Sequence, residues 1–189
     1  MIDGLDASGK TTQAYRLANF LKTQGKSVCL RVHPSDDNTL GVQAKRFLLA
    51  KGKNAHFASA LFYMLDVLYS VFRYSWRKED YVIFVRYLLG TAYLPSPMDK
   101  IAYYFFATVV PKPDKTLFID IKPEVSYSRI TKRTHGTREM FESPDALERI
   151  RKKGLALASL YNWQIVDGLG KPDDVESIIR VLLGLHEVV

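Results

Sequence analysis

A glycine-rich segment at the start of the chain restricts the possible folds more than any other feature. The sequence MIDGLDASGKTTQ fits the pattern G-x-x-x-x-G-K-[ST], with Gly4, Gly9, Lys10 and Thr11 at the defining positions. Glycines let backbone N–H groups turn inward around phosphate oxygens, and the helical pattern that follows adds its positive N-terminal end. The sequence therefore predicts a P loop that binds the phosphates of ATP.

Each residue of the predicted loop has an expected task. Lys10 reaches the β and γ phosphates, and the hydroxyl of Thr11 holds Mg²⁺, with Asp3 or Asp120 as the candidate acidic partner. Only three residues precede the loop, so we expect the chain to begin inside the central strand. The residues expected to contact the ATP phosphates are Gly4, Ala7, Ser8, Gly9, Lys10, Thr11 and Thr12.

Helical and strand patterns alternate after this loop. Apolar runs of strand length lie at 27–32, 81–85, 116–120 and 163–166. Helical patterns lie at 10–23, 40–50, 55–76, 97–108, 124–133, 145–160 and 175–185. This alternation predicts a single α/β domain over 1–189, with five parallel strands between two layers of helices, as in P-loop NTPases. Because ligands bind at the carboxyl ends of such strands, we expect the site there.

The net charge and the apolar content of the chain limit the kinds of partner that it can bind. The formal net charge of +7 suits anionic partners, namely nucleotides, nucleic acid or acidic lipids, but a solvated Lys-rich surface explains it equally well. No aromatic-basic platform motif is visible, so nucleic acid is not expected. The longest apolar run, 101–110, is about half of a membrane span, so no membrane is expected either. Without a signal peptide, we expect a cytoplasmic location.

Three classes of P-loop protein compete at this point. A GTPase would usually carry an N-K-x-D motif, which this sequence lacks. A motor ATPase could use Asp120 at the end of an apolar strand, but 189 residues leave little room for coupling elements. A small-molecule kinase needs a second anion site and mobile arginines that neutralise the transferring phosphoryl group.

The chain resembles thymidylate kinases in an ordered series of segments along nearly its whole length. The segments that carry this resemblance are GLDASGKTTQAYRLANFL, VRYLLGTAY, LFIDIKPEVSYSRITKR, REMFESPDALERIRKKGLALA and IVDG. The resemblance implies phosphorylation of dTMP to dTDP by ATP with Mg²⁺, a homodimer, and a short lid at about 133–143.

The resemblance also implies roles on the acceptor side. Arg86 matches the arginine that grips the acceptor phosphate, and Asp6 matches the acidic loop residue that contacts the acceptor sugar. Phe62, on the long helix, is the candidate for stacking on thymine, and Tyr93 could close the base pocket. Each of these two aromatic residues could equally be part of the apolar core.

The catalytic arginine of this family comes either from the P loop or from the lid. Ala7 stands at the relevant loop position and carries no charge. The resemblance therefore predicts that the lid supplies the arginine, with Arg133 and Arg138 as candidates and Lys132 as support.

Three departures from the family pattern all lie on the acceptor side. Val85 replaces the aspartate that precedes the arginine, and RVHPSDDNTLG replaces R-E-P-G-G-T, with Pro34 retained. Asp66 lies roughly where an arginine is expected. These departures leave two alternatives open: a kinase of another nucleoside monophosphate or nucleoside, and a catalytically weak nucleotide-binding protein.

Overall fold

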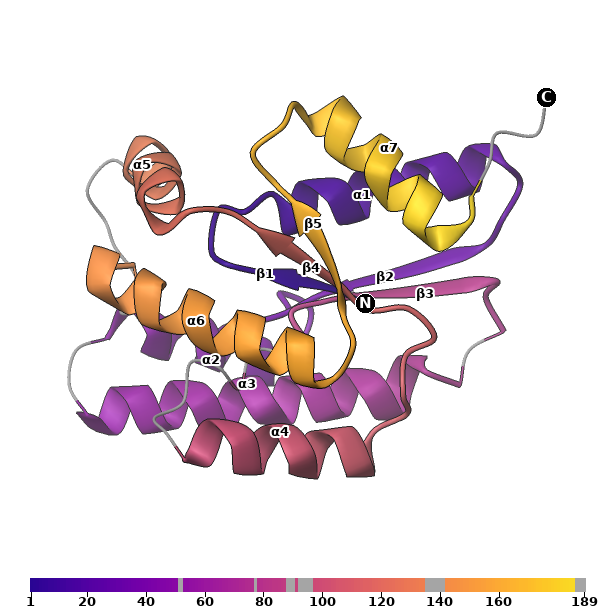
Figure 1. Cartoon of the computed structure of the whole chain (residues 1–189). Coiled ribbons are helices and arrows are strands. Elements are labelled where there is room, and N and C mark those ends of the chain that lie inside the picture. Colours follow the sequence, from indigo (N-terminus) through magenta and orange to yellow (C-terminus); the bar gives the residue numbers. More distant parts are fainter. Residues whose placement is uncertain (51–52, 77, 88–90, 92–96, 135–141, 186–189) are drawn as a thin grey trace.

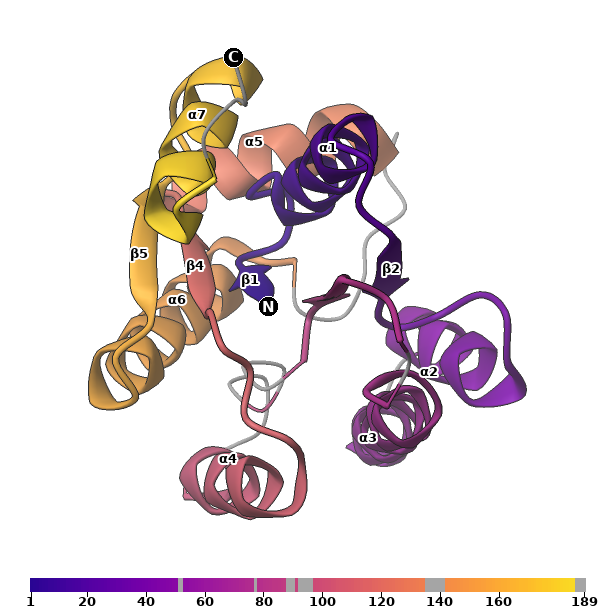
Figure 2. The ribbon, with the colours of Figure 1, turned by 90° about the vertical axis from the view of Figure 1, so that its right-hand side faces the viewer.

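The computed structural model describes residues 1–50, 53–76, 78–87, 91, 97–134 and 142–185. Within these residues, one sheet of five parallel strands has the order β2-β3-β1-β4-β5, which places β1 at its centre (Figure 1). The strands are β1 (Ile2–Gly4), β2 (Val28–Val32), β3 (Tyr81–Val85), β4 (Leu117–Asp120) and β5 (Gln164–Asp167). The predicted α/β fold is confirmed: the mainly apolar strands pair in parallel, and helices cover both faces of the sheet (Figure 2).

Helices form a layer on each side of the sheet (Figure 2). The helices are α1 (Lys10–Thr23), α2 (Thr39–Leu49), α3 (Lys53–Tyr74), α4 (Met98–Val109), α5 (Pro123–Thr134), α6 (Pro144–Leu160) and α7 (Pro172–Leu183). One face carries α1 and α7, with α5 beside them, and the other carries α3, α4 and α6, with α2 packed against α3. The predicted helix bounds agree within about three residues.

The largest difference in bounds is at α7, which begins three residues before the predicted start. Pro172 occupies the first turn, followed by Asp173 and Asp174. Proline has the fixed φ of a helix start, and the two carboxylates lie at the positive end of the helix dipole. These start signals count more than the apolar periodicity on which the predicted start at residue 175 was based.

The short central strand is held on both sides. Ile2 lies opposite Val85 of β3 and Leu117 of β4. The terminal ammonium of Met1 donates to the carbonyl of Lys115 at 2.8 Å, and Leu117 N donates to Met1 O at 2.9 Å. Pairing with β3 and β4 therefore fixes the start of the P loop.

Two apolar clusters fill the space between sheet and helices. One lies under α1 and α7 and includes Ala14, Leu17 and Ile179, each at most 4% exposed. The other lies under α3, α4 and α6 and includes Val67, Tyr103 and Leu157. Along the described part of the chain, no helix is long and apolar enough to cross a membrane.

Candidate active site

The loop between β1 and α1 has the backbone geometry of an anion cradle. Gly4 has a φ of 151°, and a Cβ there would lie 2.3 Å from the carbonyl oxygen of Ile119, so only glycine can pass the end of β4. Gly9 has a φ of 94°, and Ala7 also has a positive φ. Within this described segment, no side chain caps the start of α1 and no acidic residue lies in its first turn. The positive end of the helix dipole at that turn therefore lies next to the loop, where it favours phosphate oxygens.

Lys10 is buried over this loop. Its Nζ donates to the carbonyl of Leu5 at 2.7 Å and lies 3.6 Å from the Asp6 carboxylate. A lysine that is only 3% exposed needs such partners, because burying an unpaired charge is costly. The structure thus places the predicted phosphate-binding lysine where its charge adds to the cradle.

Arg86 reaches the same loop from β3. It follows the last residue of that strand, and its guanidinium forms an ion pair with the carboxylate of Asp6. The Arg86 side chain is 26% exposed and that of Asp6 5% exposed. A single carboxylate therefore lies between the lysine predicted for the donor phosphates and the arginine predicted for the acceptor phosphate.

The carboxylate of Asp3, in β1, supports the start of the loop. Its carboxylate accepts from Gly4 N at 2.9 Å and from Tyr87 N at 3.3 Å. Burial raises the pKa of Asp3, and the positive charges of Lys10 and Arg86 oppose that rise. Val85, where the family has an aspartate, is fully buried in the core. Asp3 thus supplies a carboxylate close to the backbone that follows Val85.

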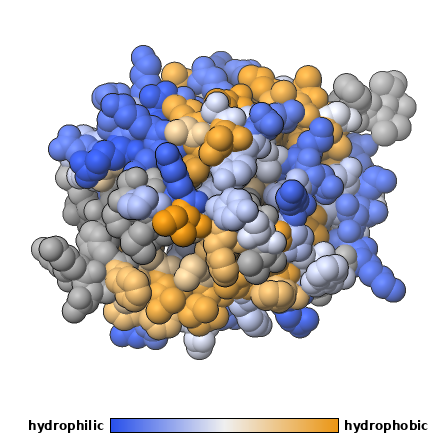
Figure 3. All heavy atoms as spheres, turned by 60° about the horizontal axis from the view of Figure 1, so that its bottom comes forward, coloured by the Kyte–Doolittle hydropathy of each residue, from blue (hydrophilic) through white to orange (hydrophobic). Residues whose placement is uncertain are grey.

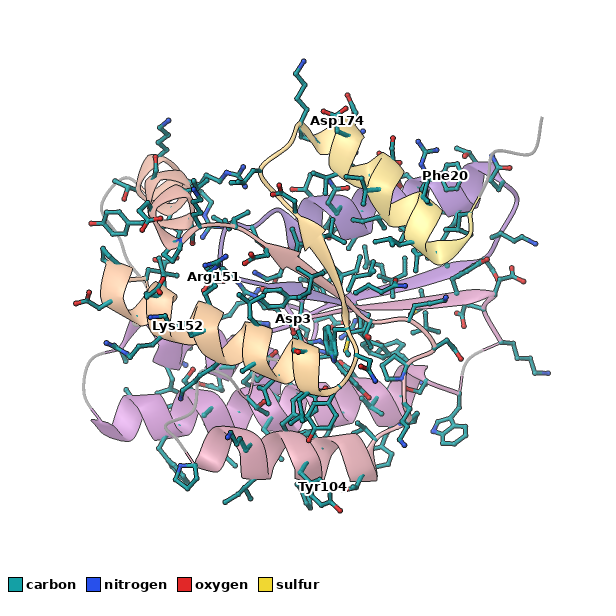
Figure 4. The ribbon with its side chains drawn as sticks, viewed as in Figure 1. Asp3, Phe20, Tyr104, Arg151, Lys152 and Asp174 are labelled. Atoms are coloured by element: carbon teal, nitrogen blue, oxygen red, sulfur yellow. The ribbon has the colours of Figure 1, made fainter. Side chains whose placement is uncertain are left out.

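Asp120, the other candidate acidic partner of the metal, is engaged by an arginine that the sequence analysis missed. Arg151 donates to both of its carboxylate oxygens, at 2.7 Å each, from α6 (Figure 4). This bidentate pair raises the pKa of the Arg151 guanidinium.

Two further residues of α5 hold the loop and were also missed. Ser126 donates its hydroxyl to Asp6 O at 2.6 Å. Arg129 donates to Ala7 O at 3.2 Å and to Gly168 O at 3.4 Å. The two residues are three positions apart, which places them on the same face of a helix. Polar residues at this spacing after a predicted strand were the signal that could have indicated them.

The carboxylate of Asp66 accepts hydrogen bonds from two residues of the loop after β2. It is fully buried and accepts from Ser35 N at 2.7 Å, Ser35 Oγ at 2.5 Å and Asn38 Nδ2 at 2.8 Å. Asn38 in turn caps α2 by accepting from Gly41 N at 2.9 Å. The residue found roughly where the family has an arginine therefore anchors the loop after β2 to α3.

Phe62 lies on α3 and is half-buried. Its ring stacks on that of Phe47 of α2, with centroids 5.5 Å apart and an interplanar angle of 8°. An aromatic partner on one side is compatible both with packing between helices and with a base on the other side. The proposed stacking on thymine stays a prediction.

The structure describes only the two ends of the predicted lid. Arg133, in the last turn of α5, has a side chain that is 60% exposed and lies 3.5 Å from the carboxylate of Glu142. Arg138 and Tyr93 lie outside the described residues, as do lid residues 135–141.

The residues around the loop fit a magnesium ion only in part. Thr11 is half-buried and lies in the first turn of α1, directly after the loop. Asp3 and Asp120 are each engaged by other groups, as described above. In the described ranges, no cluster of three or more histidine, cysteine, aspartate or glutamate residues could hold a metal ion. Thr11 therefore fits a site that phosphate oxygens and water complete.

Comparisons with known proteins agree on one family. The thymidylate kinase family model matches residues 2–179. A probable thymidylate kinase of Metallosphaera sedula is 30% identical over 98% of this chain and 92% of its own length. That of Pyrococcus horikoshii is 30% identical over 100% of this chain and 96% of its own length.

A solved structure has the same fold. A thymidylate kinase from Candida albicans, described as having a broad substrate specificity and a novel structural element, superposes with a TM-score of 0.73. The match covers 97% of this chain and 89% of that one, at 20% sequence identity. At this identity the likeness supports the fold alone.

Proposed function

The chain belongs to the thymidylate kinase family, and we propose that it carries out the family reaction with the residues described above. The reaction transfers the γ-phosphoryl group of ATP to the 5′-phosphate of dTMP, giving ADP and dTDP. The observation that carries the assignment of residues is the Asp6 carboxylate between Lys10 and Arg86, because it brings the two predicted phosphate-binding cations to one place. We also propose that residues 1–189 act as one kinase domain.

On the donor side, the backbone of the P loop and the Lys10 ammonium hold the β and γ phosphates. The hydroxyl of Thr11 is the proposed protein ligand of Mg²⁺, an ion that neutralises charge on the phosphates when bound. Arg129 fixes the carbonyl of Ala7, so the loop keeps its shape as the phosphates enter. The protein thus supplies a preformed positive site, which needs no reorganisation during transfer.

On the acceptor side, Arg86 exchanges Asp6 for the phosphate of dTMP. A guanidinium forms paired hydrogen bonds with a phosphate as it does with a carboxylate, so the exchange of partners costs little free energy. The Asp6 carboxylate then accepts a hydrogen bond from the 3′-hydroxyl of the deoxyribose. Phe62 and Tyr93 are the proposed contacts for the base.

The lid is the proposed source of the catalytic arginine. Ala7 contributes no charge to the P loop, so neutralisation of the transferring group needs a cation from elsewhere. Arg133 and Arg138 are the candidates in the proposed lid at about 133–143. Closure of such a segment also excludes water, which suppresses hydrolysis of ATP.

A homodimer is the proposed assembly, in the cytoplasm where ATP is available. The outer side of α3 carries a stripe of apolar side chains, each at least 37% exposed: Phe57, Leu61, Leu65, Tyr69 and Phe72. Ile101, Tyr104 and Phe105 of α4 are also exposed, and Tyr104 points away from the sheet (Figure 4). Apolar surface is visible on this side of the molecule (Figure 3). An apolar face of this kind is typical of a protein interface.

An assay of ADP release tests the function. The wild-type chain is mixed with Mg-ATP and, separately, with each nucleoside monophosphate and nucleoside. Turnover selective for dTMP supports the proposal, and preference for another acceptor or ATP binding without turnover contradicts it. Lys10→Ala is expected to abolish transfer, whereas Lys22→Ala, on the exposed side of the same helix, is the matched control and is expected to keep it.

A further inference from the structure

The backbone of Arg86 has a conformation that needs external support. Its φ is 58°, in the left-handed region that residues with a side chain rarely adopt. Such conformations persist only where the surrounding structure holds them, and they are frequent at functional sites. Here the conformation turns the chain at the end of β3, where the Arg86 guanidinium pairs with Asp6.

Three hydrogen bonds, two to residues of β1 and one from α3, hold this turn. Arg86 N donates to Ile2 O of β1 at 3.2 Å, and Tyr87 N donates to the Asp3 carboxylate at 3.3 Å. The hydroxyl of Tyr63, on α3, donates to Arg86 O at 2.7 Å. The bond from Tyr63 is the shortest of the three, and it is the one that connects the turn to a helix.

Tyr63 therefore connects two parts of the proposed acceptor site. It is adjacent on α3 to Phe62, the candidate for stacking on the base, and its hydroxyl holds the residue proposed to bind the phosphate. The distance between Phe62 and Arg86 must match the length of one nucleotide. Tyr63 is partly buried and packs against the apolar cluster on this side of the sheet, so its ring has a fixed position.

We propose that Tyr63 is a positioning residue for the acceptor, which sets the conformation of Arg86 relative to α3. This inference rests on the proposed function, because it takes the acceptor phosphate as the ligand of Arg86. Tyr63 acts through Arg86 and need not touch the substrate.

A double-mutant cycle tests this role. Tyr63→Phe removes the hydroxyl and keeps the ring. We expect the KM for dTMP to rise about three- to tenfold, the cost of one hydrogen bond, with kcat and the KM for ATP nearly unchanged. In an Arg86→Ala background the same change is expected to have no effect on dTMP, since the group through which Tyr63 acts is gone. An equal loss of dTMP affinity in both backgrounds would overturn the proposal.

Tyr103→Phe is the matched control for loss of a buried hydroxyl. Tyr103 lies on α4, is 2% exposed, and its hydroxyl accepts from the indole nitrogen of Trp163 at 3.0 Å. We expect it to lower stability without changing the KM for dTMP. A rise in that KM equal to the one in Tyr63→Phe would show a general effect of packing and would contradict the proposal.

A structural measurement separates this inference from the proposed function. Crystal structures of the wild-type and Tyr63→Phe chains give the φ of Arg86 without any substrate. We expect the left-handed conformation in the first and its loss, together with the Asp6 ion pair, in the second. If the wild type phosphorylates no acceptor, the proposed function fails, and the φ of Arg86 still decides whether Tyr63 holds the turn. An unchanged Arg86 in Tyr63→Phe would overturn the inference.

Discussion

The carboxylate of Asp6, in the P loop, forms an ion pair with the guanidinium of Arg86, which follows β3 and lies 80 residues away in sequence. The same carboxylate lies 3.6 Å from the ammonium of Lys10. The positive charges of Lys10 and Arg86 would repel each other if Asp6 were neutral. The negative charge of Asp6 therefore stabilises the two cations, which we propose to bind the donor and acceptor phosphates, near one carboxylate.

Removing this charge should damage acceptor use in particular. We expect Asp6→Asn to lower kcat/KM for dTMP about 10- to 100-fold, the usual range for a hydrogen bond to a charged group. The KM for ATP should change less, because Lys10 keeps its bond to the carbonyl of Leu5. Steady-state kinetics with each substrate varied in turn measure both. Asp80→Asn, which removes a carboxylate bound by Ser27, is the control.

Two substitutions of Arg86 should separate the effect of its charge from that of its paired hydrogen-bond donors. Arg86→Ala is expected to lower kcat/KM for dTMP about 100-fold, while Arg86→Lys, which keeps the charge but not the paired donors, should recover only part of it. ATP binding, measured by calorimetry, should stay within about threefold of the wild type in both. Full activity of Arg86→Ala would rule out its role at the acceptor phosphate.

Gly4 should tolerate no side chain. A Cβ at this position meets the Ile119 carbonyl and the backbone has a positive φ, so Gly4→Ala combines overpacking with strain. We expect a loss of about 2–5 kcal/mol in the free energy of unfolding, from about 1–2 for strain and about 1–3 for overpacking. Gly25→Ala is the control, since its φ is 74° and its Cβ would meet nothing within 4 Å. Denaturant unfolding that gives equal losses for the two variants would contradict the steric argument.

His33 should make the folded state sensitive to acid. Burial lowers its pKa below the usual 6.5, although the nearby Asp66 charge opposes the shift. The unfolded chain therefore binds more protons than the folded one just below pH 6.5, so stability should fall as the pH falls through that range. We expect His33→Gln, which can still donate to the carbonyl of Val85, to have a flatter dependence between pH 5.5 and 7.5. Unfolding titrations at several pH values measure this, and parallel curves would contradict it.

The sequence predicted the parts of the site that depend on local chemistry. The pattern around Lys10 fixed the position of the P loop, and the apolar run before Arg86 placed that arginine at the end of a strand. Both predictions needed only short segments, because a glycine-rich turn and a buried parallel strand are recognisable from their own residues.

The supporting residues could not be predicted in the same way. Asp66 was noted only as a departure, and Arg129 and Arg151 were missed. Each of them acts on a partner from another part of the chain: the loop after β2, the carbonyl of Ala7 and the carboxylate of Asp120. A sequence pattern does not specify such partners, since they depend on how helices pack on the sheet.

By itself, the sequence determined the class of fold, the P loop and the family, since periodicity and motif spacing are local properties. Only the tertiary structure decided that Asp6 serves two cations, that Tyr63 holds the turn of Arg86, and that Val85 and Asp66 are buried. The physical reason is that ion pairs and hydrogen bonds form between groups that are close in space. The order of strands β2-β3-β1-β4-β5 places β1 beside β3, so residues that follow these two strands meet at the carboxyl ends of the sheet, and the packing of α3 brings Tyr63 to Arg86.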